Sequence, residues 1–216
     1  MRCSDKTMLL YAVTDRAWTG KESLYEQVEK AIKGGVTCVQ LREKALDEEM
    51  FLKEAKSIRA LCHRYGIPFI VNDNVKVAVA CRADGIHVGQ EDMAAEDVRR
   101  LAGEKMLLGV SVHSVEEAKE AVARGADYLG AGAVFSTATK TDVDQMPLEV
   151  LQDICRAVEV PVVAIGGIHL ENMMELVGRG AKGVALVSAI FSAQDIEGEC
   201  RRLRRMAEEM VSVVVS

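Results

Sequence analysis

Arg124-Gly125-Ala126-Asp127 leads directly into the apolar run of residues 128–131, and this arrangement recurs along the chain of 216 residues. The related stretches are Gly34-Gly35-Val36-Thr37, Arg82-Ala83-Asp84-Gly85 and Arg179-Gly180-Ala181-Lys182-Gly183. They lie roughly 40–55 residues apart, about the length of two strand–helix units. Their glycines suit the left-handed conformation that ends many helices. The recurrence therefore predicts a fold built from repeated units, in which each helix is followed by a strand.

Short apolar runs alternate with longer stretches in which apolar residues recur at helical spacing. The expected strands are residues 9–13, 38–41, 69–71, 85–88, 107–110, 128–131, 162–165 and 183–187. The expected helices are residues 24–33, 48–65, 75–81, 95–101, 115–124, 148–158, 170–178 and 195–211. Strict alternation predicts parallel strands joined by helical crossovers. We expect a single-domain (β/α)8 barrel, a TIM barrel, over residues 1–216; a doubly wound sheet is the alternative.

The composition is that of an ordinary globular protein, with 49% hydrophobic and 28% charged residues. The net charge of -6 argues against a general nucleic-acid or anionic-membrane binder, but it is compatible with a small anionic substrate. The six cysteines form no C-x-x-C pair, which predicts buried thiols in a reducing cytoplasm. We expect neither a signal peptide nor a membrane-spanning helix. Association into a homo-oligomer is left open by the sequence.

Carboxylates follow two neighbouring expected strands. Asp73 comes just after residues 69–71, and Asp92 comes soon after residues 85–88. The active site of a TIM barrel is built from the loops at the carboxyl ends of its strands. Mg²⁺ typically takes one or two carboxylates together with substrate phosphates and water. Each aspartate alone also suits a helix N-cap, but the pair, with Arg42 and Lys140 facing it, favours a metal site.

The second expected strand ends in Gln40-Leu41-Arg42-Glu43-Lys44. Because side chains alternate along a strand, Gln40 and Arg42 share one face. Arg42 can bind phosphate oxygens bidentately, and Lys44 adds a point charge. The alternative is a structural Arg–Glu pair within the barrel. In the fourth strand, His87 lies in an apolar run, which favours a hydrogen-bonded core histidine over a ligand.

Phosphate-binding groups occur late in the chain. Gly166-Gly167 follows the seventh strand, and Val187-Ser188 opens a helix after the eighth, where barrel enzymes commonly bind phosphate. The polar segment Thr137-Ala138-Thr139-Lys140 is typical of a lid loop. Ordinary turn glycines and a solvated turn are the alternatives. Carboxylates on one side and phosphate donors on the other indicate an enzyme that handles a diphosphate.

The motifs as a set are similar to those of a known family. They are Tyr11-Ala12-Val13-Thr14-Asp15, Gln40-Leu41-Arg42-Glu43-Lys44, Asn72-Asp73, Ala83-Asp84-Gly85-Ile86-His87-Val88-Gly89-Gln90-Glu91-Asp92, Gly109-Val110-Ser111, Thr137-Ala138-Thr139-Lys140 and Ala164-Ile165-Gly166-Gly167-Ile168. In this order they resemble the thiamine-phosphate synthase family over nearly the whole chain. The resemblance implies a Mg²⁺-dependent cytoplasmic transferase that joins hydroxymethylpyrimidine diphosphate to a thiazole phosphate, or its carboxylated form, with release of pyrophosphate.

The resemblance also implies roles for residues at matching positions. The implied pyrimidine-diphosphate contacts are Gln40, Leu41, Arg42, Glu43, Lys44, Asn72, Ser111 and Lys140, of which Arg42, Ser111 and Lys140 are expected to be catalytic. The implied thiazole-phosphate contacts are Thr137, Ala138, Thr139, Gly166, Gly167, Val187 and Ser188, and the implied Mg²⁺ ligands are Asp73 and Asp92. No protein nucleophile is needed, which fits the lack of a convincing nucleophilic constellation. A thiazole tautomerase-like paralogue and a non-catalytic phosphate-binding barrel are the alternatives.

Overall fold

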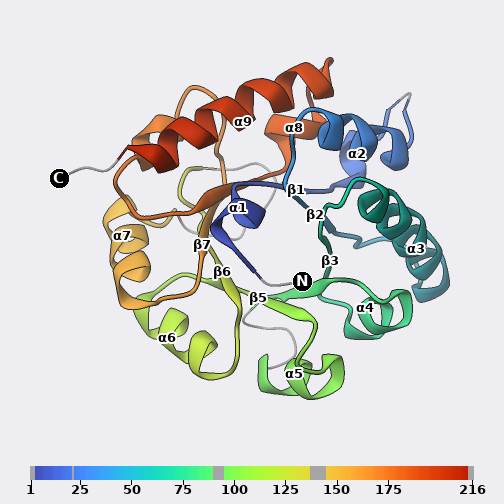
Figure 1. The fold of residues 1–216 in the computed structure, drawn as a ribbon, viewed down its shortest axis with the longest axis horizontal. Helices are drawn as coiled ribbons and strands as arrows, with labels where there is room; N and C mark the ends of the chain where they lie inside the picture. The colour runs from blue at the N-terminus through green and yellow to red at the C-terminus, as the bar shows by residue number, and fades with distance from the viewer. Residues whose placement is uncertain (1–2, 21, 90–94, 137–144, 214–216) are drawn as a thin grey trace.

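Eight parallel strands close into a barrel in the order β1 to β8, with β1 paired to β8 (Figure 1). The structure is a computed structural model, and it describes residues 3–20, 22–89, 95–136 and 145–213. The strands are β1 (Leu10–Val13), β2 (Cys38–Leu41), β3 (Phe69–Asn72), β4 (Gly85–Val88), β5 (Leu107–Val112), β6 (Tyr128–Ala131), β7 (Val162–Ile165) and β8 (Gly183–Leu186). All eight expected strands are present within two residues at either end. The barrel prediction is confirmed, and the doubly wound alternative is wrong.

The longer helices form a ring around the barrel, and α1 lies over its centre (Figure 1). The helical segments are α1 (Asp5–Met8), η1 (Arg16–Trp18), α2 (Leu24–Lys33), α3 (Glu48–Arg64), α4 (Val75–Cys81), α5 (Ala95–Ala102), α6 (Val115–Ala123), α7 (Leu148–Ala157), η2 (Met173–Leu176), α8 (Ser188–Phe191) and α9 (Ile196–Ser212). Side-chain caps begin many of them, as in α2, where Ser23 and Glu26 form a reciprocal capping box. Within the described residues, no helix is long and apolar enough to cross a bilayer.

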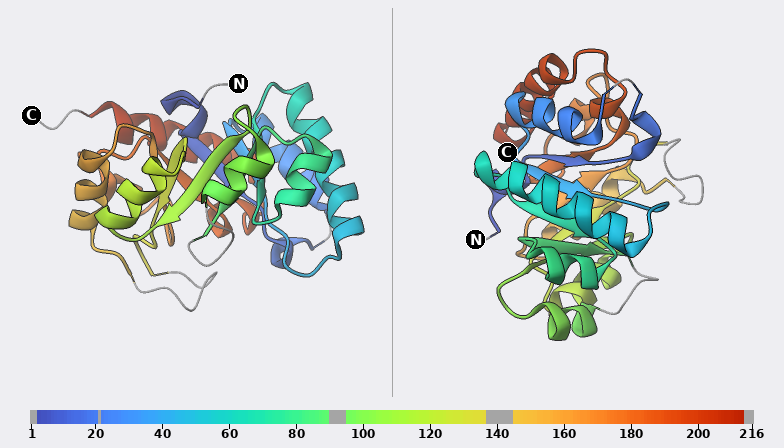
Figure 2. Two further views of the ribbon diagram at one scale, coloured as in Figure 1. Left: turned by 90° about the horizontal axis from the view of Figure 1, so that it is seen from below. Right: turned by 90° about the vertical axis from the view of Figure 1, so that its right-hand side faces the viewer.

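The 3-10 turn η1 and two further helical segments differ from expectation. The helix expected over 170–178 is only the single 3-10 turn η2, because the Asn172 side chain bonds to the backbone before it and holds a turn there. The short helix α1 was not expected. The Ser4 hydroxyl caps it, and its Met8 is fully buried. Figure 2 shows α1 at the end of the barrel opposite the turn that follows β2, so α1 covers the amino ends of the strands.

Two apolar layers stabilise the fold. The larger lies between the strands and the surrounding helices, and the smaller fills the barrel interior with Met8, Tyr11, Ile70, Leu107 and Tyr128 among others. Each fully buried large apolar side chain contributes about 1.5–3 kcal/mol. The cysteines are unpaired, as expected, and most are buried. Burial raises the pKa of the Cys62 thiol to about 12, so this thiol stays protonated at neutral pH.

Candidate active site

The loops after β1 and β2 are joined by two ion pairs between successive residues. Arg42 Nη1 lies 3.4 Å from Asp15 Oδ2, and Arg16 binds both carboxylate oxygens of Glu43, at 2.8 and 3.1 Å. Arg16 also pairs with Glu54 of α3. Burial, and next the neighbouring Glu43 carboxyl, raise the pKa of Glu54. The Glu43 side chain is only 1% exposed, so the expected Arg–Glu pair exists, but its arginine is Arg16 and not Arg42.

Strand β3 ends in a strained residue. Asp73 has a φ of 60°, which is uncommon for a residue other than glycine and concentrates at functional sites. Its N–H donates to the His87 carbonyl at 2.8 Å, and its carboxylate accepts a hydrogen bond from the Asn72 amide. The residue that caps α4 is Asn74, whose Oδ1 accepts from Val77 N at 3.0 Å. The helix-cap alternative for Asp73 is therefore wrong, and its exposed carboxylate lies at the carboxyl end of β3.

A chain of hydrogen bonds crosses the barrel interior below these loops. Gln40 Nε2 donates to the Tyr11 hydroxyl at 2.9 Å, and the hydroxyls of Tyr11 and Tyr128 share a bond of 2.8 Å. His87 continues the chain, with Nδ1 at 3.1 Å from the Tyr128 hydroxyl and Nε2 at 2.9 Å from Ser111 Oγ. His87 is thus a hydrogen-bonded core histidine, as expected. Gln40 and Ser111, both expected substrate contacts, are linked through buried side chains.

The sequence did not lead us to expect Tyr11 and Tyr128, the two tyrosines in this chain of hydrogen bonds, beneath the site. Each lies in a strand that is buried on both faces, and a buried tyrosine hydroxyl needs a hydrogen-bond partner. That requirement was the available signal, although the partner of Tyr11 is 117 residues away along the chain.

Gly109 of β5 makes room for this chain of hydrogen bonds. A Cβ at this position would lie 2.1 Å from Tyr128 Cζ and 2.5 Å from His87 Nδ1. We expect Gly109→Ala to lower the free energy of unfolding by about 3 kcal/mol or more, since both rings are buried and cannot move aside. Urea unfolding measures the change. The control is Gly20→Ala, whose Cβ would meet nothing within 4 Å. Equal stability of the two variants would contradict the expectation.

The turn after β7 presents backbone groups. Gly166 and Gly167 have φ values of 99° and 64°, which favour glycine. Their carbonyls are occupied, because Gly166 O accepts from Phe135 N at 3.1 Å and Gly167 O accepts from Asn172 Nδ2 at 2.9 Å. Among the described residues no acceptor pairs with the N–H groups of Gly167, Ile168, Ser188 and Ala189. Unpaired amides of this kind suit an anion.

The remaining expected residues are placed as follows. The Leu41 side chain packs in the outer apolar layer, Lys44 is exposed, and Val187 is the N-cap of α8. Asp92, Thr137, Ala138, Thr139 and Lys140 lie outside the described residues. Within the described residues, no group of three or more His, Cys, Asp or Glu side chains is arranged to hold a metal ion. A Mg²⁺ site with two carboxylates and substrate phosphates would not need such a group.

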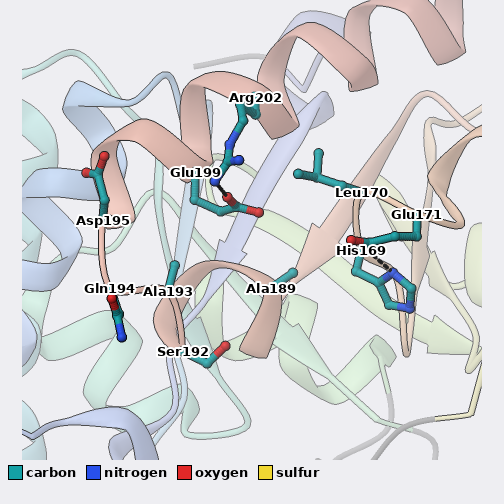
Figure 3. A pocket seen from close by; sticks show the side chains of 10 residues that line it. All are labelled: His169, Leu170, Glu171, Ala189, Ser192, Ala193, Gln194, Asp195, Glu199 and Arg202. Atoms are coloured by element: carbon teal, nitrogen blue, oxygen red, sulfur yellow. Dashed lines mark hydrogen bonds and ion pairs between the residues drawn. The ribbon is translucent and has the colours of Figure 1, made fainter.

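A hollow of about 430 Å³ lies beside the turn after β7 and includes none of the expected residues (Figure 3). It is lined by His169, Leu170, Glu171, Ala189, Ser192, Ala193, Gln194, Asp195, Glu199 and Arg202. Its charged side chains are engaged within the protein: His169 pairs with Glu171, Arg202 pairs with Glu199, and Asp195 caps α9. We therefore assign the candidate site to the carboxyl ends of the strands and not to this hollow.

The fold and the polar end of the barrel define a TIM-barrel enzyme in which backbone N–H groups after the last two strands have no acceptor among the described residues. Residues 10–190 match the family described as thiamine monophosphate synthase, and the chain belongs to this family. The thiamine-phosphate synthase of Ruminiclostridium cellulolyticum is 47% identical over 90% of this chain and 92% of that protein. The enzyme of Clostridium acetobutylicum is 45% identical over 89% and 91% of the two chains. The expected family is confirmed.

A solved structure agrees with these matches. The thiamine phosphate pyrophosphorylase from Pyrococcus furiosus superposes with a TM-score of 0.90 and 39% sequence identity. The match covers 96% of this chain and 99% of that one, so the similarity extends to the whole barrel.

Proposed function

We propose that this chain joins hydroxymethylpyrimidine diphosphate to a thiazole phosphate, or its carboxylated form, and releases thiamine phosphate and pyrophosphate. The proposal depends on one observation: two sets of polar groups lie at the same end of a barrel of this family. Arg42, Asn72 and Asp73 follow β2 and β3, and the amides of the Gly166-Gly167 turn and of α8 follow β7 and β8. The first set suits a diphosphate and the second a phosphate monoester.

In this reaction the bond between the exocyclic carbon of the pyrimidine and the diphosphate oxygen breaks, and its electron pair leaves with pyrophosphate. The thiazole ring nitrogen then supplies the electron pair for the new carbon–nitrogen bond. The aminopyrimidine ring can support positive charge on its methylene carbon. Gln40 and Ser111 orient that ring, and their positions are supported by the buried chain that links them. Arg42, Lys44 and Lys140 bind the departing diphosphate.

We propose Asp73 and Asp92 as the carboxylates that hold Mg²⁺. Asp73 fits this role because its carboxylate is exposed just past the end of β3, at the end of the barrel where the diphosphate is proposed to bind. When bound, Mg²⁺ neutralises charge that builds on the leaving pyrophosphate. Arg42, 3.4 Å from Asp15, supplies a further positive charge next to that position.

The thiazole phosphate is proposed to bind Gly166, Gly167, Val187 and Ser188, and Thr137, Ala138 and Thr139, which lie outside the described residues, are proposed as further contacts. We also propose that residues 1–216 form one domain, and that the protein works in the cytoplasm, where unpaired thiols persist.

Gly167→Val is expected to raise the KM for the thiazole phosphate about tenfold or more, with little change in the pyrimidine-diphosphate KM. A Cβ at Gly167 would lie 2.3 Å from Ser136 O, so the turn must move. The matched control is Gly103→Val, which has a similar positive φ, 76°, but open space around its Cβ. Steady-state kinetics of both variants decide the matter. An equal rise in both KM values would indicate general misfolding.

Incubation of the purified protein with both substrates and Mg²⁺ tests the function. We expect pyrophosphate and thiamine phosphate in equal amounts. Isomerisation of the thiazole without pyrophosphate would instead identify a tautomerase. Binding of either phosphorylated compound without turnover would identify a phosphate-binding barrel, and either result would reject the proposed reaction.

A further inference from the structure

We infer that Asn172 is a positioning residue that aims the phosphate-binding amide of Ile168. The inference rests on the proposed phosphate site in the turn after β7. Asn172 lies just before η2 and is half-buried. No motif of the sequence analysis included it. Its side chain bonds to three groups of the turn that precedes it, and this set of contacts carries the argument.

Both ends of the Asn172 amide are engaged. Nδ2 donates to Gly167 O at 2.9 Å, and Oδ1 accepts from His169 N at 2.9 Å. These partners fix which end is nitrogen, because the opposite orientation would set oxygen against oxygen and N–H against N–H. The second hydrogen of Nδ2 faces His169 Nε2 at 3.2 Å. With Nε2 as acceptor, His169 Nδ1 carries the proton and donates to Glu171 Oε2 at 2.7 Å. Figure 3 shows this histidine and Glu171 beside the hollow.

The hydrogen bond from Asn172 to the Gly167 carbonyl also sets the direction of the Ile168 N–H, because both groups belong to one peptide plane. A trans peptide is planar, and its C=O and N–H point in opposite directions. Asn172 holds the Gly167 carbonyl, so the Ile168 N–H of the same peptide points away from Asn172. In the preceding peptide Phe135 N holds the Gly166 carbonyl, which sets the direction of Gly167 N–H in the same way. Each of the two N–H donors is thus oriented through the carbonyl of its own peptide, Gly167 N–H by the backbone after β6 and Ile168 N–H by the Asn172 side chain.

The turn needs this side-chain hydrogen bond because its two glycines would otherwise allow several backbone conformations. Gly166 and Gly167 adopt positive φ values, and glycine has many alternative conformations of similar energy. Without the Asn172 bond, the peptide between Gly167 and Ile168 is free to rotate, and the Gly167 carbonyl can then face the phosphate. A carbonyl oxygen in that place would repel the anion. Asn172 therefore favours phosphate binding without touching the phosphate.

Asn172→Ala tests the inference. We expect the KM for the thiazole phosphate to rise about tenfold, the effect of losing one hydrogen bond, with kcat at saturation and the pyrimidine-diphosphate KM within about twofold of the parent. Asn172→Asp keeps an acceptor for His169 N but cannot donate to Gly167 O, so it should raise the same KM at least as much. Glu175→Ala is the matched control, since it removes an exposed side chain of η2 that takes no part in the bonds of Asn172.

A second readout separates this inference from the proposed reaction. Amide hydrogen exchange at Gly167 and Ile168, with inorganic phosphate as the probe, should slow on phosphate addition in the parent and in Glu175→Ala but not in Asn172→Ala. That result would support the inference even if the parent formed no thiamine phosphate. A parent-like thiazole-phosphate KM in Asn172→Ala would overturn the inference and leave the reaction intact. An equal rise in both KM values of Asn172→Ala, together with a lowered Tm, would also overturn the inference.

Discussion

Asp73→Asn is expected to lower kcat roughly a hundred- to a thousandfold at saturating substrates, the usual effect of losing one preorganised charge interaction with a leaving group. Asparagine is the sharpest replacement for two reasons. It tolerates the φ of 60° that Asp73 adopts, whereas alanine would add backbone strain. It also keeps the size of the side chain and removes only the negative charge. Folding should be unaffected, because Asn74 and not Asp73 caps α4.

The measurement is turnover against Mg²⁺ concentration. If Asp73 holds the cation, the half-saturating Mg²⁺ concentration should rise together with the fall in kcat. The matched control is Asp97→Asn, which removes an exposed carboxylate of α5 whose ion pair among the described residues is with Arg100. Normal turnover of Asp73→Asn at limiting Mg²⁺ would show that the metal assignment is wrong.

Arg42→Ala is expected to lower kcat/KM for the pyrimidine diphosphate by roughly a hundredfold or more, because a charge-assisted contact to the diphosphate is lost in both ground and transition states. The Arg42 side chain is 13% exposed and has the carboxylate of Asp15 at 3.4 Å. That separation is longer than a strong ion-pair hydrogen bond, so the guanidinium retains donors for a substrate oxygen. Arg42→Lys should recover only part of the loss, since an ammonium cannot bind two oxygens in one plane.

Steady-state kinetics with each substrate varied in turn distinguish this role from a structural one. The thiazole-phosphate KM should stay near the parent value, since its proposed site lies after β7 and β8. Arg100→Ala, on the exposed face of α5, is the control. If Arg42→Ala lost thermal stability instead, with kcat/KM within about threefold of the parent, Arg42 would be a structural partner of Asp15 only.

The barrel could be predicted from the sequence because its signals are local and repeated. Arg124-Gly125-Ala126-Asp127 and its relatives mark where one helix ends and the next strand begins, and each strand needs only a few apolar residues. The helix starts are equally local: Ser23 caps α2, and Asp195 caps α9. The fold in turn predicted which end of the barrel carries the expected site residues, since the carboxyl ends of parallel strands lie together.

Pairings between distant residues were decided only by the tertiary structure. The sequence allowed Asp73 as a helix cap, but its left-handed backbone leaves that role to Asn74. Closure of the barrel brings Tyr11 against Tyr128, so that a buried chain of hydrogen bonds forms across it.

The structure also decided which arginine pairs with Glu43 and whether residues 170–178 form a helix. Arg16 takes Glu43 because the loops after β1 and β2 lie side by side. The turn before η2 exists because Asn172 reaches back to Gly167 and His169. The physical reasons differ. The Arg16–Glu43 pair joins residues 27 apart and depends on where the fold brings two loops together, which periodicity and capping within a segment do not describe. The Asn172 bonds are local, but they compete with the helix that the apolar spacing predicts, and only the structure shows which of the two forms.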